Sequence, residues 1–328
     1  MSIANKLKKN YKKLTHKISR LVSDGIYRIK QANYRLQLPK LTKDGQKIVE
    51  QLNQEGIFMI PLEQLPFESN YSLLEALEKL RKDLIAVSSD SSIRDYHRGF
   101  KHCIPINPTK IARDYPELFL WGLDEKLLDI IENCIGLPVA YHGVIARKEI
   151  VDGQQIGSRR WHKDGEDRNI IRLTLYLNDV LDETAGPFEY IPRSLTPSYK
   201  AFEQNSDILD EHMSKVVPRE KWKMCLGSKN TVVFGTVAKI FHHGKVPLQE
   251  RMAVSFHYTS RNPLNEERCR EFSFEKGIPL ITAPLTMRQQ ECLWKYQKLL
   301  PKRSPQMYLR DGKMLTLLKP KTSGKSNY

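Results

Sequence analysis

Long apolar runs and paired cysteines are both missing from this chain of 328 residues. No run of eighteen apolar residues occurs, so a helix that crosses a membrane is not expected. The basic N-terminus is not followed by an apolar stretch or a small-residue cleavage site, so no secretory signal is predicted. The five cysteines are widely spread without a Cys-x-x-Cys pair. This pattern favours reduced thiols in a cytoplasmic protein over a structural zinc site.

The middle of the chain has no excess of basic residues, although the net charge of the whole chain is +15. Residues 1–40 carry a net charge of +10 and residues 301–328 carry +6, which leaves −1 for everything between them. Proteins that bind nucleic acid usually carry a basic stripe on the domain that makes the contact. The charge therefore belongs to two arms, and nucleic-acid binding is not expected.

Residues 3–22 predict a basic amphipathic helix within an N-terminal arm of residues 1–40. Three roles stay open for this helix: packing on its own domain with a solvated basic face, docking on a partner, or lying on an anionic membrane surface. The prediction depends on apolar residues at steps of three and four, namely Ile3, Leu7, Tyr11, Leu14, Ile18 and Leu21, with Lys8, Lys9, Lys12, Lys13 and Lys17 between them.

A main domain over residues 41–275 is expected to begin with helices. The pattern predicts a helix ending at Gly56, a buried strand bounded by Pro61, and then two more helices, over residues 66–90 and 114–135. These helices make up a helical front that ends at residue 139. Residues 276–328 are expected to form a helical segment and a basic tail.

Short strands follow from residue 141 onwards, separated by turns rich in glycine and proline. In the run Ile170–Leu177, Arg172, Thr174 and Tyr176 fall on one face, and the other face carries Ile171, Leu173, Leu175 and Leu177. Many short strands behind a helical layer predict a β-sandwich or barrel with helices outside, which is a mostly β fold of the α+β class.

One pair of residues in this region has the spacing of metal ligands. His162 and Asp164 are two positions apart, so on an extended chain both side chains leave from the same face. By itself the pair fits a surface histidine beside a surface aspartate equally well. A third ligand is available at His242 or His243. An iron site that also binds a keto acid needs a fixed guanidinium, and Arg251 stands nine residues after His242.

Four stretches of the chain, covering about residues 140–262, carry a family resemblance. The sequences WHKDGEDRN, LYLNDV, GPFEYIPRS and FHHGKVPLQER resemble the landmarks of the iron(II)/2-oxoglutarate-dependent oxygenases, particularly the phytanoyl-CoA dioxygenase-like branch. The resemblance implies a double-stranded β-helix core of the jelly-roll or cupin type. It also implies that 2-oxoglutarate binds the iron through one end and pairs with an arginine through its distal carboxylate.

Carried over residue by residue, the resemblance implies that His162, Asp164 and His242 bind Fe(II) and that Arg251 binds the distal carboxylate of 2-oxoglutarate. His242 is preferred to His243 because it directly follows a phenylalanine, as the ligand does in related F-H-x-G segments. The implied activity is a dioxygenase that uses O2 to hydroxylate a small-molecule or lipid-like substrate and releases succinate and CO2. Halogenating relatives lack the carboxylate, so Asp164 favours hydroxylation.

Other residues near the predicted site have two interpretations each. Thr174 either donates its hydroxyl to 2-oxoglutarate or packs across strands. Trp161 and Lys163 either face the substrate entrance or are an edge aromatic and a solvated lysine. Tyr141 and Arg147 share the parity of the site on the preceding strand. Five other histidines lack a spacing partner and are expected to be hydrogen-bonded or on the surface; they are His97, His102, His142, His212 and His257.

A second function is compatible with the same sequence. The chain would then be a catalytically silent β-helix protein that binds a membrane surface or a partner through its basic arms. The presence of all three ligands and of Arg251 argues against this alternative. Substrate selection is expected to come from the loops at residues 90–115, 150–160 and 195–220.

Overall fold

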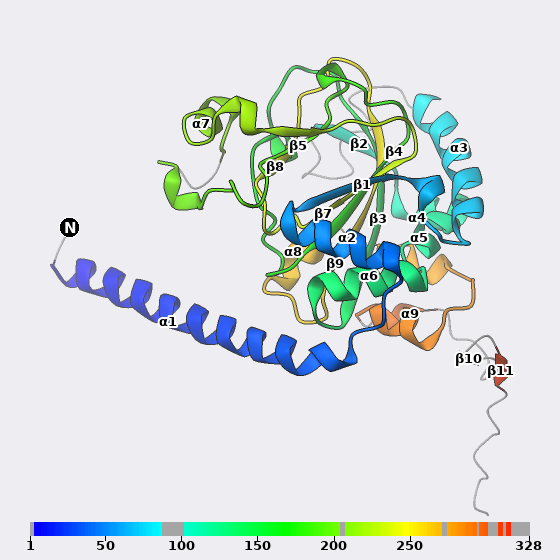
Figure 1. Ribbon diagram of the computed structural model, residues 1–328, viewed down its shortest axis with the longest axis horizontal. Coiled ribbons are helices and arrows are strands. Elements are labelled where there is room, and N and C mark those ends of the chain that lie inside the picture. Colours follow the sequence, from blue (N-terminus) through cyan, green and yellow to red (C-terminus); the bar gives the residue numbers. More distant parts are fainter. Residues whose placement is uncertain are drawn as a thin grey trace, which may run out of the picture.

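A six-stranded antiparallel sheet lies at the centre of the computed structural model (Figure 1). Its strands, in spatial order, are β1 (Ile57–Pro61), β7 (Thr231–Gly235), β4 (Ile171–Tyr176), β9 (Met252–Ser260), β3 (Val139–Glu149) and β2 (Cys103–Pro105). A three-stranded sheet has the order β6 (Lys223–Cys225), β5 (Phe188–Tyr190) and β8 (His242–Gly244). The predicted α+β fold is confirmed, and the structure adds that the strands of both sheets pair antiparallel.

The structure describes residues 3–86, 102–203, 207–270, 274–293, 295–300, 308–310 and 313–315. Over these ranges, no strand pairing joins the two sheets into a closed barrel. His97, which is expected to be hydrogen-bonded or on the surface, lies outside the described residues, and so does part of the loop 90–115 that is expected to select the substrate. A small hairpin, β10 (Tyr308–Arg310) with β11 (Lys313–Leu315), is found in the C-terminal tail.

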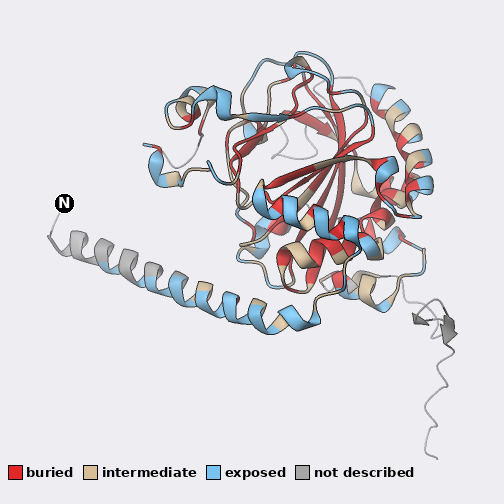
Figure 2. Cartoon of the chain, in the orientation of Figure 1, coloured by how far each residue is buried: buried red, intermediate tan, exposed pale blue. Residues whose placement is uncertain are grey.

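Helices cover the outer face of the six-stranded sheet, where the aliphatic residues of the strands point. Leu173 and Leu175 of β4 and Val254 and Phe256 of β9 are buried in this layer, and Figure 2 shows the sheet as the most buried part of the molecule. The helical front of the chain contributes α2 (Lys43–Gln54), α3 (Asn70–Ala86), α4 (Pro108–Asp114), α5 (Pro116–Trp121) and α6 (Glu125–Ile135). The C-terminal segment contributes α9 (Met287–Cys292). Two short helices, α7 (Asp210–Ser214) and α8 (Glu266–Cys269), lie in loops.

The prediction of a single helix over residues 114–135 is wrong, because the structure has two helices there, α5 and α6. Pro116 occupies the first turn of α5, which ends at Trp121 with Gly122 as its C-cap. Asp124 then starts α6 by accepting hydrogen bonds on its side chain from the backbone N–H groups of Lys126 and Leu127. An N-cap aspartate inside the apolar pattern therefore divides the two helices.

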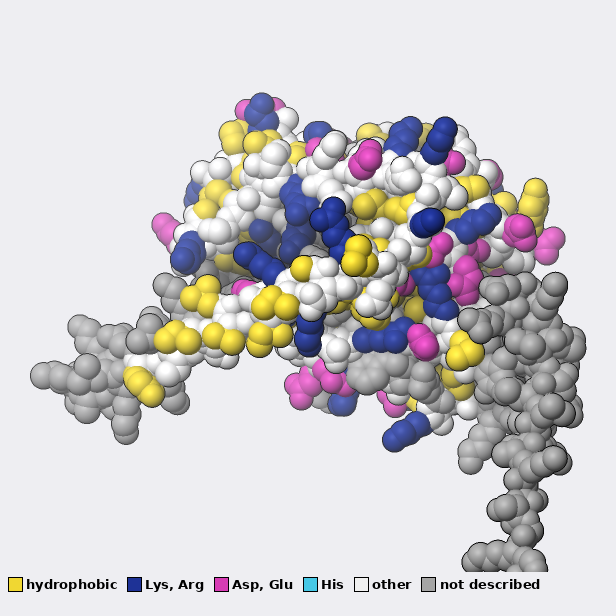
Figure 3. All heavy atoms as spheres, turned by 60° about the horizontal axis from the view of Figure 1, so that its bottom comes forward, with side chains coloured by type: hydrophobic (Ala, Val, Ile, Leu, Met, Phe, Trp, Pro, Cys, Tyr) yellow, Lys and Arg dark blue, Asp and Glu magenta, His cyan; other side chains and the backbone are white. Residues whose placement is uncertain are grey.

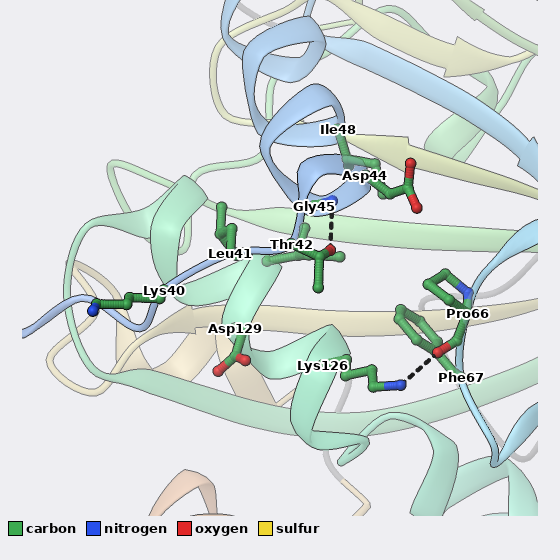
Figure 4. Close-up of a pocket in the computed structure, with 11 residues that line it drawn as sticks. Lys40, Leu41, Thr42, Asp44, Gly45, Ile48, Pro66, Phe67, Lys126 and Asp129 are labelled. Atoms are coloured by element: carbon green, nitrogen blue, oxygen red, sulfur yellow. Dashed lines mark hydrogen bonds between the residues drawn. The ribbon is translucent and has the colours of Figure 1, made fainter.

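The capping of α2 is visible in the close-up of Figure 4. The Thr42 hydroxyl accepts from the backbone N–H of Gly45 at 3.1 Å, and Lys126 of α6 donates to the Pro66 carbonyl at 2.9 Å. The hollow between these elements has a volume of about 30 Å³, which is enough for roughly one water molecule. It is therefore a packing defect between α2 and α6 rather than a ligand site.

Helix α1 (Ile3–Tyr34) is longer than the predicted helix of residues 3–22 and extends away from the sheets (Figure 1). Its C-terminal half contacts the body through Asp24, Tyr27, Gln31 and Tyr34. Within the described residues, no helix is both long and apolar enough to cross a membrane.

Candidate metal centre

The structure brings His162, Asp164 and His242 together, although His242 is eighty residues away in the sequence. The backbone N–H of His162 donates to the carbonyl of His242 and the reverse bond is also made, both at 3.0 Å. This pairing extends the three-stranded sheet beyond β8 and sets the two imidazole rings 4.4 Å apart. One donor atom from each of the three residues lies within 4.8 Å of the others.

The distances suit one shared ion. Asp164 Oδ1 lies 3.4 Å from Nε2 of His162 and 3.7 Å from Nε2 of His242. Two ligand atoms that are each about 2.1 Å from one ion are separated by about 3 to 4 Å. The three side chains therefore have the spacing of a two-histidine, one-carboxylate site.

Hydrogen bonds leave the correct ring nitrogen available on both histidines. His162 Nδ1 lies 2.7 Å from the carbonyl of Arg160, and His242 Nδ1 lies 3.3 Å from the carbonyl of Ile240. A carbonyl only accepts, so both Nδ1 atoms carry the proton and both Nε2 atoms present a lone pair. The Nε2 of His242 is buried and has no hydrogen-bond partner among the described residues. A bound cation would satisfy this atom.

The carboxylate of Asp164 is held by Arg172, the first polar side chain of β4. Arg172 Nη2 lies 2.5 Å from Asp164 Oδ2, which leaves Oδ1 directed at the two histidines. Burial alone would raise the pKa of Asp164, but Arg172 and the histidines outweigh it and hold this pKa well below its ordinary value. Asp164 is therefore ionised, as a metal ligand must be.

Burial and the neighbouring His162 lower the pKa of His242 well below its ordinary value, so the ring is neutral. The ring of Phe188 on β5 stacks on it at a centroid distance of 5.1 Å. A neutral imidazole can bind a cation, whereas a protonated one cannot.

His243 points away from this group, to the other face of the small sheet. Its Nε2 lies 2.8 Å from Glu189 Oε2 and its Nδ1 lies 2.9 Å from the carbonyl of Arg159. Both ring nitrogens are therefore occupied, and the Trp161 ring packs against the imidazole at 4.0 Å. Because neighbouring side chains on a strand alternate, only His242 reaches Asp164.

A polar strip runs along the inner face of the six-stranded sheet from this centre. Arg172 and Thr174 of β4 stand directly opposite His257 and Ser255 of β9. Thr174, Ser255 and His257 are all buried, and the Ser255 hydroxyl has no hydrogen-bond partner among the described residues. The strip offers hydrogen-bonding groups for a polar ligand inside the molecule.

Arg251 lies at the far end of this strip, immediately before β9, and not beside the three candidate ligands. Its Nη2 pairs with Glu149 Oε1 at 3.1 Å, and its Nη1 donates to the carbonyl of Gly186. Arg147 also pairs with Glu149, at 2.9 Å, and Arg159 approaches the same carboxylate at 3.7 Å. The buried Nε of Arg251 has no hydrogen-bond partner among the described residues.

His102, Cys103 and Glu149 form a second cluster with metal-like spacing. Three guanidinium groups surround its only carboxylate, and burial raises the pKa of the Cys103 thiol above its ordinary range. A protonated thiol beside several positive charges does not attract a cation. This cluster is therefore better suited to an anion than to a metal.

The structure separates Tyr141 from the site, whereas Arg147 does face the inner strip. A β-bulge between Tyr141 and Gly143 reverses the parity of β3, so Tyr141 packs with Tyr258 and Phe119 in the helical layer. The predicted shared parity of Tyr141 and Arg147 is therefore wrong. A bulge adds one unpaired residue, which the alternation of a sequence does not reveal.

The two residues that flank His162 are turned away from the ligand atoms. Trp161 is buried and donates to Asp210 at 2.8 Å, so it is a core residue of the small sheet rather than an edge aromatic. Lys163 is half-buried over the Phe241 ring and donates to the carbonyl of Pro197 at 3.0 Å. Burial lowers the pKa of Lys163 to about 8.

Sequence reasoning gave no role to Arg172, Ser255 or Glu149. For Arg172 a signal was present, because it shares the inward parity of Thr174 directly after the His-x-Asp pair. Glu149 and Ser255 carry no such signal, since their neighbours come from strands far apart in the chain.

No family model and no curated protein matches this chain. Solved structures do resemble it. HygX from Streptomyces hygroscopicus, with nickel, 2-oxoglutarate and hygromycin B bound, shares 14% identity over 67% of this chain and 88% of its own, with a TM-score of 0.44. The carbocyclase SnoK from nogalamycin biosynthesis, described as non-heme and alpha-ketoglutarate-dependent, shares 15% identity over 68% and 86%, with a TM-score of 0.45.

EctD from S. alaskensis, with 2-oxoglutarate and 5-hydroxyectoine, shares 17% identity over 67% of this chain and 79% of its own, with a TM-score of 0.45. With identities below 25% and TM-scores below 0.5, these likenesses do not assign this chain to a family, so the superfamily and its phytanoyl-CoA dioxygenase-like branch both stay predictions. Likenesses this distant do not assign a reaction, so the function of this chain depends on what its own side chains can do.

Proposed function

We propose that this chain is an Fe(II)/2-oxoglutarate-dependent dioxygenase that hydroxylates a small molecule. The observation that carries the proposal is the group of His162, Asp164 and His242, in which both Nδ1 atoms are engaged by carbonyls and Nε2 of each ring is directed at one carboxylate oxygen. Two imidazoles and one carboxylate on one side of an ion leave other positions open for substrates, which is typical of non-heme iron oxygenases.

The charges at the far end of the polar strip support binding of a dicarboxylate. Arg147, Arg159 and Arg251 carry three positive charges against two negative charges on Glu149 and Asp152. The cluster is thus left with one positive charge inside the protein. The distal carboxylate of 2-oxoglutarate would balance it.

Specific donors are available for that carboxylate. The Nε–H of Arg251 and the hydroxyl of Ser255 are buried without hydrogen-bond partners among the described residues, and Thr174 faces Ser255 across the strands. Unsatisfied buried donors are unfavourable unless a ligand meets them. We assign Arg251, with Thr174 and Ser255, to 2-oxoglutarate.

When bound, iron and 2-oxoglutarate would activate O2, so that one oxygen atom enters the substrate and the other enters succinate while CO2 leaves. The chain's own contribution is geometric. Arg172 fixes the orientation of Asp164, and the backbone carbonyls fix both imidazoles. The identity of the small molecule would be set by loops around the entrance.

The alternative of a catalytically silent protein finds less support in the same side chains. An abandoned metal site has no reason to keep a buried, unpartnered Nε2 on His242 opposite an ionised carboxylate. Such a buried polar atom is costly without a ligand. A bound metal ion would satisfy this atom, which supports a working metal site.

The test combines turnover with binding. Purified protein should release succinate from 2-oxoglutarate slowly without any substrate, and this release should require both Fe(II) and O2. Calorimetry under anaerobic conditions should show that 2-oxoglutarate binds to Co(II)-loaded protein. Absence of keto-acid binding to the metal-loaded protein would contradict the proposal.

Variants identify the residues responsible. Asp164→Ala should abolish succinate release and weaken Co(II) binding by roughly 100-fold or more. Asp164→Asn preserves the shape beside Arg172 and should fail in the same way, which separates loss of the ligand from loss of folding. The matched control is Glu183→Gln, an exposed carboxylate that pairs with Lys245, and it should retain full activity.

A further inference from the structure

Helix α1 presents a stripe of large apolar side chains to solvent. The exposed fractions are 70% for Tyr11, 63% for Leu21 and 62% for Ile29, and Ile18, Val22 and Ile26 are also exposed. Figure 3 shows apolar side chains in a row along this helix. A contiguous apolar surface of this kind marks an interaction site in a soluble protein.

Contacts with the body fix which side of α1 faces outwards. Arg168 donates to Asp24 and to Ser23, both at 2.7 Å, and its guanidinium lies over the Tyr27 ring. One turn further on, Gln31 donates to the carbonyl of Ile135 at 2.7 Å. Tyr27 is buried, so the body occupies this side of the helix.

The apolar stripe lies on the opposite side. At about 100° per residue, Ile18, Val22 and Ile29 fall close to one line along the helix, and Tyr27 falls roughly half a turn away from it. The apolar stripe is therefore not covered by the described part of the protein's own domain, although the opposite side of α1 packs on it through Tyr27 and Gln31.

No single heptad register covers the stripe from Tyr11 to Ile29 without a break. A heptad that starts with Ile18 and Leu21 requires apolar residues at the next two core positions, but these are Gly25 and Arg28. The apolar residues instead follow the period of a straight α-helix, at about 3.6 residues per turn. A straight stripe suits a flat surface better than a second supercoiled helix.

The charge of the arm points to the nature of that surface. Residues 1–40 carry a net charge of +10, and Arg28, Lys30 and Arg35 are exposed. The only acidic residue in this stretch is Asp24, and Arg168 neutralises it on the body side. The outward side thus combines apolar and basic character without any acid.

We infer that the outward stripe of α1 docks in the interface of an anionic lipid bilayer. The apolar side chains enter the boundary between headgroups and acyl chains, and the basic side chains meet the lipid charge. The contacts of Arg168 and Gln31 then hold the domain on the aqueous side. This inference stands whether or not the proposed reaction is correct.

The experiment is flotation of the full-length protein with vesicles. Vesicles of phosphatidylcholine with about 30% phosphatidylserine should carry the protein upwards, and pure phosphatidylcholine vesicles should not. The double substitution Val22→Ser and Ile29→Ser should weaken binding by at least about tenfold. Arg28→Gln with Lys30→Gln should weaken it by roughly tenfold in low salt.

The matched control is Leu181→Ser with Leu248→Ser, which removes two exposed leucines from loops of the body and should leave flotation unchanged. Sedimentation velocity without vesicles supplies the second measurement. Equal binding to neutral and anionic vesicles would overturn the inference. So would a stable dimer that Val22→Ser and Ile29→Ser dissociate, because the stripe would then belong to a second copy.

Discussion

Arg172 shows how one side chain completes the candidate metal centre. Strand alternation places it on the inward face of β4 together with Thr174, and this much follows from the sequence. Its partner Asp164 sits in a segment outside the named strands, where no register exists to predict a contact. Their 2.5 Å ion pair therefore appears only in the structure.

Substitution of Arg172 tests whether it positions Asp164. Arg172→Met should reduce Co(II) affinity by about 10- to 100-fold, because Asp164 then loses the contact that directs Oδ1 at the histidines. Arg172→Lys keeps the charge without the planar donor group, so its Co(II) affinity should lie between those of the unmodified protein and Arg172→Met. Affinities come from anaerobic calorimetry.

Arg261→Met is the control, since it breaks a guanidinium–carboxylate pair with Glu291 at the surface. It should bind Co(II) as the unmodified protein does. If Arg172→Met keeps full Co(II) affinity, the ion pair is a structural feature without influence on the metal.

At the scale of elements, the bulge in β3 decides which side chains of that strand face the strip. Gly143 has a φ of +116° at the bulge. A Cβ at this position would lie 2.3 Å from Cβ of Phe274, which cannot move aside easily. The strand can therefore change parity only because residue 143 is glycine.

Gly143→Ala should lower the free energy of unfolding by about 3 kcal/mol, from backbone strain and overpacking together. Gly153→Ala is the matched control. Gly153 also has a positive φ, of +67°, but a Cβ added there would meet no atom within 4 Å, so the loss should be only about 1 kcal/mol. Urea denaturation of both variants provides the comparison, and equal losses would show that the contact with Phe274 is unimportant.

At the scale of the whole molecule, the buried charges around Glu149 connect distant parts of the chain. Glu149 on β3 meets Arg251 ahead of β9, and Arg159 joins it from the segment that leads to His162. Burial would raise the pKa of Glu149, but Arg251 and Arg147 outweigh it and lower this pKa to about 2. The ionised form therefore stabilises the folded state.

Acid stability should reflect this cluster. The ordinary pKa of Glu149 is 4.5 and the folded value is about 2, so its stabilisation is complete above pH 4.5 and is lost as the pH falls towards 2. Glu149→Gln should cost about 3 kcal/mol of unfolding free energy at neutral pH, and the cost should shrink below pH 4.5.

Urea denaturation at a series of pH values measures this difference. Glu291→Gln removes a half-exposed carboxylate that pairs with Arg261 at 3.0 Å and should cost little at any pH. A cost of Glu149→Gln that does not change with pH would contradict the assigned role of the ionised carboxylate.

The sequence alone determined the strands of the β region, the amphipathic character of α1, the fold class and the choice of His162, Asp164 and His242 as candidate ligands. These follow from local periodicity, spacing and the recognised motifs, which depend on neighbours along the chain. Only the tertiary structure decided the rest: Arg172 beside Asp164, Glu149 beside Arg251, the reversal of β3 and the outward direction of the α1 stripe. Each of these features depends on contacts between segments far apart in the chain or on one unpaired residue. Such contacts and such a residue produce no periodic pattern in the sequence.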